Sequence, residues 1–282
     1  MFATIGATIA EMLKLDSVRF YENGVISLNL PVCAQVVGGK ATRTTHPRVI
    51  AGFCKLLSKV AGKPFIVENP FIDKTKGEVV SLIGNAGCRD LIGPSISCTH
   101  TWEMTLKHSH CGTCSQCIDR RFAIIAAGME DAEPKTQYKC NVFTQCRNNN
   151  QKISEDKTMY AGYLERANQA DNVKDCIEFL SKCPEAVRVL SYLPGDEGQV
   201  AERILAMYKR HSEEVNRVVE TMVARYSKAI RQRTLPADCM IRIIHESNLP
   251  TSVTAKTTVQ APLPDNIFRR NGDVWQVRYD GG

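Results

Sequence analysis

The sequence has no segment that would place it in a membrane. Its 282 residues include no apolar run near the ~20 residues that a spanning helix requires. The apolar opening MFATIGATIAEML has no basic segment before it and no small-residue cleavage site after it, and Glu11 interrupts it. We therefore expect neither a membrane span nor a signal peptide, and we expect a location in the reducing cytoplasm.

The sequence also has only a small excess of charge of one sign. Lys and Arg total 36 against 30 for Asp and Glu, and the basic residues are spread along the chain without interleaved aromatic residues. A modest positive charge tolerates phosphorylated or carboxylated ligands. It does not indicate a nucleic-acid partner, for which basic residues cluster. RNA binding through the RRF and IRQR segments stays an alternative, which salt-dependent association would reveal.

The first part of the chain alternates between helical and strand-like patterns. Apolar residues at spacings of three and four predict helices, and β-branched or aromatic runs predict strands. This alternation favours an α/β sheet. In chain order we expect a buried helix over 2–15, a strand that ends in a turn at Asn23-Gly24, an irregular loop over 31–47, a helix over 49–60, a strand closing on Pro70, and a helix over 74–84 that stops at Gly84.

The later part of the chain has a different composition. The stretch before Asn150 is polar and unpatterned, and two helical segments follow it, over 157–182 and 197–232. The second helix carries an apolar seam from Val200 to Ile230, which predicts packing against another helix or a second copy. We divide the chain into an α/β part over 1–130, a helical domain over 151–235, and an extended tail or start of a further domain over 236–282.

Cysteine is abundant, with twelve residues, four of them within SCTHTWEMTLKHSHCGTCSQCIDRRF. In a reducing compartment, closely spaced thiols are metal ligands or catalytic groups more often than disulfides. A Cys-x-x-Cys-x-x-Cys run at Cys111, Cys114 and Cys117 lets three thiolates point at one centre, and Cys98 lies upstream as a fourth. The four together predict a structural zinc site, which has no open position for water.

Other interpretations of this cysteine stretch remain open. An iron–sulfur cluster of the bacterial ferredoxin type would add a proline after its fourth cysteine, and none follows Cys117. A disulfide or free thiols are further alternatives, and His100, His108 or His110 could replace one sulfur ligand. The other eight cysteines are scattered and are expected to be free thiols.

NPFIDKTKGE followed by CTHTWEMTLKHSHCGTCSQCIDRRF resembles the C-terminal half of the 7-cyano-7-deazaguanine synthase family, also called ExsB or QueC. The resemblance covers about residues 2–130. It implies a partial Rossmann-like ATP pyrophosphatase (PP-loop) domain with a zinc loop, followed here by an α-helical domain. The matched positions are Pro70, Lys76, Glu78, Cys98, Cys111, Cys114, Cys117 and Arg120 or Arg121.

The resemblance also implies a chemistry. Members of that family use ATP and Mg²⁺ to adenylate a 7-deazaguanine carboxylate, and then replace the activated oxygen by nitrogen to form a nitrile through an amide. It implies a structural Zn²⁺, and Lys76 as a catalytic, phosphate-contacting residue. Glu78 is expected at the substrate, and the basic loop with Arg43, His46 and Arg48 is suited to bind a carboxylate or phosphate.

The sequence departs from the family in two places. The Ser-Gly-Gly-x-Asp-Ser segment that cradles pyrophosphate is missing, and Gly38-Gly39 stands without the serine and acidic residues around it. An acidic residue follows a proline in the family's substrate loop, whereas Arg48 follows Pro47 here. We therefore expect the later part of a longer enzyme that lacks its ATP-binding motif.

The helical region resembles extensions found in relatives from bacterial anti-phage clusters, where a related enzyme acts on a protein partner. This resemblance implies an alternative function, in which the chain is a zinc-stabilised interaction module of an anti-phage complex and does not catalyse a reaction. In that case a protein partner, or a second copy in a homodimer, would bind the helices over 157–232.

Overall fold

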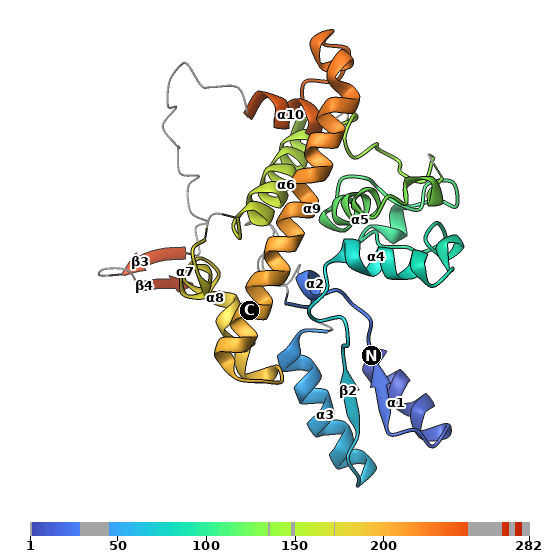
Figure 1. The fold of residues 1–282 in the computed structure, drawn as a ribbon, viewed down its shortest axis with the longest axis vertical. Coiled ribbons are helices and arrows are strands. Elements are labelled where there is room, and N and C mark those ends of the chain that lie inside the picture. Colours follow the sequence, from blue (N-terminus) through green and yellow to red (C-terminus); the bar gives the residue numbers. More distant parts are fainter. Residues whose placement is uncertain are drawn as a thin grey trace, which may run out of the picture. The chain divides into compact units, whose positions relative to one another are not determined.

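The computed structural model describes most of the chain, and its secondary structure is largely helical (Figure 1). Met1–Ser247 form one compact unit and Asn248–Gly282 a second. Within the described part, no helix has the length and apolar character needed to cross a membrane. The described residues are 2–28, 45–134, 136–147, 150–171, 173–247, 267–270 and 274–277.

The first elements form a small α/β layer around two parallel strands. Ser17 of β1 pairs with Ile66 of β2, and Arg19 pairs with Glu68. The partial α/β character expected from the sequence is therefore present, in a sheet of two described strands. The layer consists of α1 (Phe2–Met12), β1 (Ser17–Arg19), α2 (Gly24–Leu28), α3 (Pro47–Ala61) and β2 (Ile66–Glu68).

Helix α1 forms where the sequence predicts it, but the prediction that its large apolar residues are buried is wrong. Its buried residues are Ala3, Ala7 and Ala10, while its large side chains are exposed. The reason is close packing against the sheet: a Cβ atom added at Gly6 would lie 3.1 Å from Cγ1 of Val18. Small residues face the sheet because there is no room for larger ones.

The expected turn at Asn23-Gly24 is instead the start of a short helix, α2. The side chain of Asn23 accepts a hydrogen bond from the backbone N–H of Ile26 at 3.1 Å, as an N-cap does. Gly24 is required by packing, because a Cβ atom there would lie 1.8 Å from the carbonyl oxygen of Ile72. The local sequence predicted a turn at the Asn-Gly pair, whereas long-range packing makes this pair the start of a helix.

The remaining helices of the first unit pack around α9. Its apolar seam is buried against α5, α6 and α7, so the seam packs within this chain. α4 and α5 of the expected α/β part also contact α9 directly. These helices are α4 (Lys76–Asn85), α5 (Ser115–Ala126), α6 (Asn150–Asn168), α7 (Cys176–Lys182), α8 (Pro184–Val187), α9 (Glu197–Arg231) and α10 (Met240–Ser247), with single 3-10 turns at Arg89–Leu91, Thr101–Glu103, Glu130–Ala132 and Leu190–Tyr192.

The predicted ends of α4 and α9 agree closely with the structure. The prediction of one helix across α6 and α7 is wrong. Residues 157–182 were expected to form one helix, but α6 ends at Asn168 and α7 begins anew at Cys176. The side chain of Asp175 accepts a hydrogen bond from the backbone N–H of Glu178 at 2.9 Å and caps α7. In the second unit, β3 (Ile267–Arg270) and β4 (Val274–Val277) pair as antiparallel strands, and β4 lies in the predicted terminal strand.

Candidate metal centre

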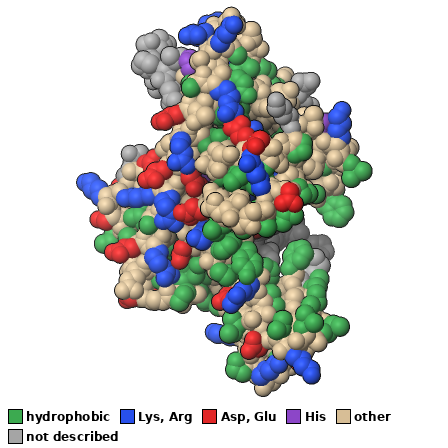
Figure 2. Space-filling model, turned by 45° about the vertical axis from the view of Figure 1, so that its right-hand side comes forward, with side chains coloured by type: hydrophobic (Ala, Val, Ile, Leu, Met, Phe, Trp, Pro, Cys, Tyr) green, Lys and Arg blue, Asp and Glu red, His purple; other side chains and the backbone are tan. Residues whose placement is uncertain are grey.

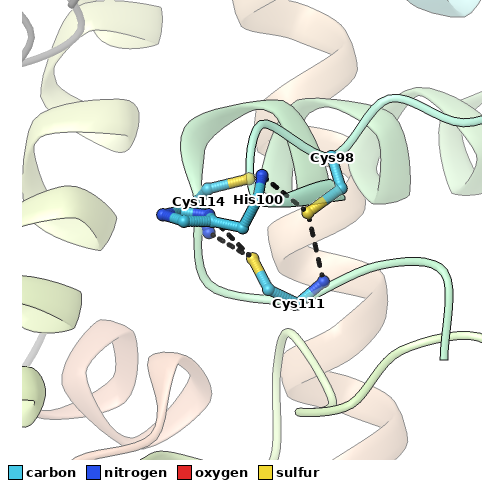
Figure 3. Close-up of side chains that lie close together, drawn as sticks. All are labelled: Cys98, His100, Cys111 and Cys114. Carbon is cyan, nitrogen blue, oxygen red and sulfur yellow. Dashed lines mark hydrogen bonds between the residues drawn. The ribbon is translucent and has the colours of Figure 1, made fainter. Parts of the chain in front are cut away.

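The four cysteines predicted as ligands lie together at the start of α5. Sγ of Cys111 lies 3.7 Å from Sγ of Cys117, and the buried thiols of Cys98, Cys114 and Cys117 pack in one cluster with Cys111. The side chain of His100 joins this group, and the ligand atoms of Cys98, His100, Cys111 and Cys114 all lie within 4.8 Å of one another (Figure 3). The cluster therefore brings five candidate ligands to one point.

The geometry of the cluster fits a zinc ion. Tetrahedral coordination with Zn–S bonds of about 2.3 Å sets the sulfur atoms about 3.8 Å apart. Hydrogen bonds from Cys111, Cys117 and Cys98 hold the pKa of the Cys114 thiol below its ordinary value. The backbone N–H groups of His100 and Cys111 donate to Sγ of Cys98 at 3.3 and 3.4 Å. Such donors stabilise thiolates, the form in which cysteine binds metal.

The loop between the cysteines is shaped by a close approach of the following chain. Gly112 has φ of +84°, and a Cβ atom there would lie 1.7 Å from the carbonyl oxygen of Cys140. The backbone N–H of Cys140 donates to the carbonyl oxygen of Cys111 at 3.2 Å, and that of Lys139 donates to the carbonyl oxygen of His110 at 2.8 Å. The segment around Cys140 thus covers the cysteine loop, and only glycine fits where the two backbones meet.

The three histidines of this stretch have different roles. Nε2 of the fully buried His110 accepts a hydrogen bond from the backbone N–H of Ser97 at 3.2 Å. Burial and the nearby charge of Arg120 lower the pKa of His110 to about 4, so it is neutral at physiological pH. Nδ1 of His108 faces the carbonyl oxygen of Thr136 at 2.8 Å. Among the three, His100 is the one that lies with the thiols.

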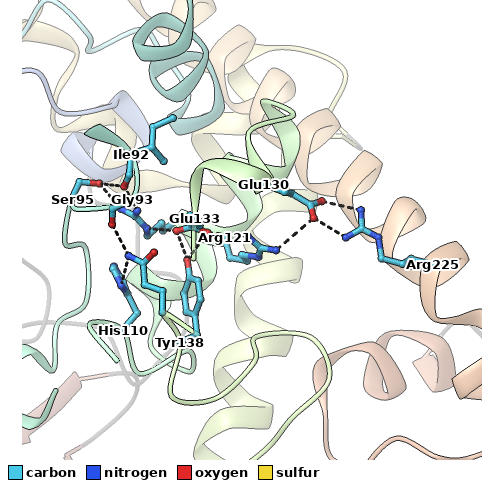
Figure 4. Close-up of polar contacts among 11 residues, drawn as sticks. Ile92, Gly93, Ser95, His110, Arg121, Glu130, Glu133, Tyr138 and Arg225 are labelled. Atoms are coloured by element: carbon cyan, nitrogen blue, oxygen red, sulfur yellow. Dashed lines mark hydrogen bonds and ion pairs between the residues drawn. The ribbon is translucent and has the colours of Figure 1, made fainter. Parts of the chain in front are cut away.

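Arg120, one of the two arginines suggested by the family resemblance, is buried, and Figure 4 shows its partner Glu133 together with Arg121. Its Nε donates to Oε1 of Glu133 at 2.7 Å, and Arg121 donates to Oε2 of the same carboxylate at 2.9 Å. Arg120 also donates to the carbonyl oxygen of Ile92 at 2.5 Å and to Oγ of Ser95 at 2.7 Å. These bonds tie the segment that leads to Cys98 onto α5.

Lys76 is joined to the cysteine-bearing helix by an ion pair. Its Nζ lies 3.0 Å from Oδ2 of Asp119, two residues after Cys117 in α5, and the lysine side chain is 16% exposed. Burial raises the pKa of two further carboxyl groups nearby, that of Glu214 to about 7 and that of Glu22 above its ordinary range. The single ammonium group is therefore surrounded by acids, and a bound phosphate would have to compete with Asp119 for it.

A small polar cavity of about 10 Å³ adjoins this ion pair, roughly the space of one water molecule. It lies where α4, α5, α6 and α9 meet. Tyr163, His211 and Glu214 line it together with Lys76 and Asp119. The hydroxyl of Tyr163 donates to Oδ1 of Asp119 at 3.5 Å, so the buried carboxylate is held from two sides.

Two of the other predicted substrate contacts, Glu78 and His46, have structural partners. Glu78 accepts a hydrogen bond from the backbone N–H of Thr75 at 2.8 Å, which completes a capping box at the start of α4, and pairs with Arg210 of α9 at 2.8 Å. His46 caps α3, where its Nδ1 accepts the backbone N–H of Arg48 at 3.3 Å. Arg43 lies outside the described residues. The structure brings the cysteines together, links Lys76 to them through Asp119, and places His46 and Arg48 on another helix.

Sequence reasoning missed Asp119, Glu133 and Glu214. Asp119 had a local signal, since it is an acidic residue between the apolar residues Ile118 and Phe122 at helical spacing. Glu133 lies in a polar stretch, and Glu214 in a helix with many acidic residues, so nothing local marks either as buried.

Comparison with known proteins gives one likeness. No protein-family model and no solved structure matches the chain. Over 136 residues, which are 46% of this chain and 53% of the relative, it is 29% identical to the 7-cyano-7-deazaguanine synthase of Saccharophagus degradans (strain 2-40). The chain resembles 7-cyano-7-deazaguanine synthase. It spans about half the length of that curated relative.

Proposed function

We propose that this chain is the zinc-bearing part of an ATP-dependent enzyme of the 7-cyano-7-deazaguanine synthase type. Such an enzyme adenylates the carboxylate of 7-carboxy-7-deazaguanine, and ammonia displaces AMP to give the amide. Adenylation of the amide oxygen by a second ATP, followed by loss of AMP, then gives the nitrile, a step of queuosine or related deazaguanine modification. The observation that carries the proposal is the convergence of the four predicted cysteines in a chain that resembles a named synthase.

In this proposal a zinc ion would be held by Cys98, Cys111, Cys114 and Cys117, with His100 as the competitor for the fourth position. A closed thiolate site supplies structure, because it leaves no position for water. Its effect on catalysis would pass through α5, which carries both Cys117 and Asp119. Zinc would thereby set the position of Lys76 at the start of α4.

The proposed zinc site is tested by substituting Cys117 and His100, the two residues that could supply the fourth ligand. We expect Cys117→Ser to lower the bound zinc well below about one ion per chain, and His100→Ala to leave it unchanged. In cobalt-loaded protein, the sulfur-to-metal absorption should weaken in Cys117→Ser and persist in His100→Ala. The reverse result would assign the fourth position to His100.

The synthase activity is tested on the native protein, purified through an affinity tag. With 7-carboxy-7-deazaguanine, ammonia, ATP and Mg²⁺, we expect release of AMP and pyrophosphate. Lys76→Ala should lower kcat/KM by about 100-fold, the size of a lost contact to a charged group in the transition state. Lys55→Ala, which removes an exposed lysine of α3, is the matched control. Undiminished turnover in Lys76→Ala would remove Lys76 from the site.

A second candidate is a zinc-stabilised interaction module without catalysis, as in an anti-phage complex. The observation that favours it is the loop between Cys98 and Cys111, where Trp102 and Leu106 are fully exposed. Large apolar side chains in water are typical of contact surfaces when they cluster. A stable protein partner that is lost in Trp102→Ala, in a preparation without ATP turnover, would support this candidate over the synthase.

A further inference from the structure

A cavity of about 910 Å³ lies beside the cysteine loop, and we call it the loop pocket. One wall is the part of the loop between Cys98 and Cys111. The other walls are the segment around Gly93 and the segment that ends at Gln137. Small-molecule sites have volumes of this size, and a few polar groups in a mainly apolar lining orient the ligand. The residues of the lining therefore indicate which kind of ligand would fit.

The loop pocket is separate from Lys76. Lys76 is the first residue of α4, whereas the pocket residues Asp90 and Gly93 follow the end of this helix at Asn85. The 10 residues of α4 extend over about 15 Å. The pocket thus lies beyond the opposite end of α4, and the proposed phosphate contact of Lys76 does not account for it.

Gln137 brings a buried hydrogen-bond acceptor without a partner to this pocket. The residue is 5% exposed, and its Nε2 donates to the carbonyl oxygen of Gly93 at 2.9 Å. This bond fixes the orientation of the amide, because a carbonyl oxygen can only accept. Oε1 of Gln137 has no hydrogen-bond partner among the described residues. A buried acceptor without a partner is costly, and an N–H group of a ligand would satisfy it.

Two charged side chains of opposite sign complete the polar lining. Asp90 lies three residues before Gly93, on the segment that Gln137 holds, and Lys107 lies on the loop wall. Both are exposed, and neither side chain has an ion pair within the part of the chain that the structure describes. The lining therefore offers acceptors and one strong donor with no net charge, which suits a neutral ligand.

The apolar part of the lining is exposed to water. Ile96 is 61% exposed and Leu106 is fully exposed, and both line the pocket together with Met104. A flat ring that lies against these side chains would remove apolar surface from water. The apolar groups therefore favour a ligand with a broad, uncharged face.

The loop wall is held in shape by its own hydrogen bonds. The backbone N–H of Thr105 donates to the carbonyl oxygen of His108, and that of His108 donates to Oγ1 of Thr105, both at 3.2 Å. Nδ1 of His108 lies 2.8 Å from the carbonyl oxygen of Thr136 on a neighbouring wall. Cys98 and Cys111 bound the loop and belong to the metal centre. A zinc ion there would fix both ends of this wall.

Another hollow, of about 530 Å³, lacks such an acceptor. It lies between α1 and α3, in the layer where Figure 2 shows hydrophobic side chains gathered on the surface. Its polar lining residues Thr4, Thr8 and Glu11 are all exposed to water. The buried acceptor of Gln137 therefore distinguishes the loop pocket from an apolar surface groove.

We propose that the loop pocket binds a flat, neutral heterocycle with adjacent N–H donors, as on the guanine base, and that these donors bond to Asp90 and to Oε1 of Gln137. The N1–H and 2-amino groups of guanine are such donors. Its O6 and N7 atoms accept hydrogen bonds, commonly from lysine or arginine, and Lys107 is in place to donate them. The ring face covers Ile96 and Leu106. This site goes beyond the proposed synthase reaction and requires no ATP.

Guanosine is the probe that tests the pocket. We expect the native, metal-bound protein to bind guanosine in isothermal titration calorimetry, and adenosine at least about 10-fold more weakly. The reason is that N1 of adenine is an acceptor where guanine has an N–H donor, which would leave the acceptors of the pocket unpaired. No binding of guanosine at millimolar concentration, or equal binding of the two nucleosides, would overturn the proposal.

Substitutions in the lining test the assignment of the donors. Asp90→Asn changes an exposed side chain, so the chain should fold, and guanosine binding should weaken by about 10- to 100-fold. Glu103→Gln, which changes an exposed acid of the same loop outside the lining, is the matched control and should keep the affinity. Gln137→Leu should weaken binding similarly, with its fold checked by urea unfolding. Unchanged affinity in Asp90→Asn would refute the assignment whether or not Gln137→Leu folds.

The binding assay contains no ATP, so its result is independent of the proposed activity. Guanosine binding by a protein without synthase turnover would refute the proposed function and leave the loop pocket as a binding site. Turnover by a protein that binds no guanosine would refute the pocket and leave the proposed function.

Discussion

The cysteine region and the α1 layer are built in opposite ways. Around the cysteine loop, charged and polar side chains such as Arg120 and Glu133 are buried and paired, and α9 buries its large apolar residues. In helix α1 the small residues face inward and the large ones face outward, and the ion pair of Arg19 in β1 with Glu68 in β2 is exposed. The first region buries its charged and apolar groups among its own residues, whereas helix α1 of the second exposes its large apolar side chains.

The two regions also differ in how they gain stability. Buried ion pairs and metal ligands are sensitive to the loss of a single partner, because an unpaired buried charge or an empty ligand set is costly. A layer with exposed side chains loses little when one of them is truncated. The same change made in both regions should therefore give unequal effects, and the following predictions use that inequality.

The largest effect is expected from removing one thiol of the metal centre. Cys114→Ser should lower the bound zinc to a small fraction of one ion per chain and destabilise the fold by several kcal/mol, since structural zinc binding contributes on the order of 10 kcal/mol in small domains. Metal analysis and denaturant unfolding measure both quantities. Cys88→Ser, outside the cluster, is the control and should change neither.

Breaking the buried pair of Arg120 and Glu133 should come next. Glu133→Ala leaves the guanidinium of Arg120 buried without its carboxylate, which costs about 3–5 kcal/mol of unfolding free energy. Asp131→Ala breaks the exposed pair with Arg89, and exposed pairs contribute about 0–1 kcal/mol. Equal losses in the two variants, measured by urea unfolding, would contradict the contrast between buried and exposed pairs.

A matched methionine pair compares the two regions directly. Met222 of α9 is 2% exposed and Met12 of α1 is 78% exposed. Met222→Ala should cost about 2–5 kcal/mol through lost packing and a cavity, while Met12→Ala should stay within about 0.5 kcal/mol. Thermal or urea unfolding of the chain alone measures both. A large loss in Met12→Ala would mean that the outer face of α1 is already covered.

The smallest expected effect is a pH dependence from Glu214, which contacts the start of α4. Its carboxylate accepts a hydrogen bond from Thr75 at 2.7 Å, yet burial raises its pKa to about 7. Because the folded pKa lies above the unfolded value, the fold favours the protonated acid. The contribution of Glu214 to the unfolding free energy should therefore be greatest below about pH 4.5 and fall by on the order of 2 kcal/mol up to about pH 7.

Glu214→Gln should remove that dependence, since the amide does not titrate. The measurement is the difference in unfolding free energy between the original chain and Glu214→Gln at a series of pH values, in which other titrating groups cancel. A difference that stays constant from pH 4.5 to 7 would contradict the raised pKa.

Local patterns predicted what depends on local interactions. The seam of α9 and the helical spacing of α4 follow from the sequence, and the structure confirms both helices nearly to the residue. The convergence of Cys98 with the later cysteine run was predicted from ligand count. Which residues are buried around Lys76 was not predictable, because Thr75 and Glu214 meet across 139 positions of sequence.

The orientation of α1 is the clearest case in which the same pattern allowed two structures. Its spacing of apolar residues specifies a helix and two apolar faces, one with small and one with large side chains, but not which of them meets the sheet. The position of Gly6 against Val18 decides this, because the backbone of α1 lies too close to β1 for large residues.

By itself the sequence determined the ends of α4 and α9, the cysteine spacing and the resemblance to a synthase, because each of these lies in residues close along the chain. Only the tertiary structure decided that Asp119 pairs with Lys76, that Arg120 and Glu133 link the cysteine loop to α5, and that the large side chains of α1 are exposed. These features depend on contacts between distant segments, and burial changes the energies of their charges and apolar groups by more than local preferences do.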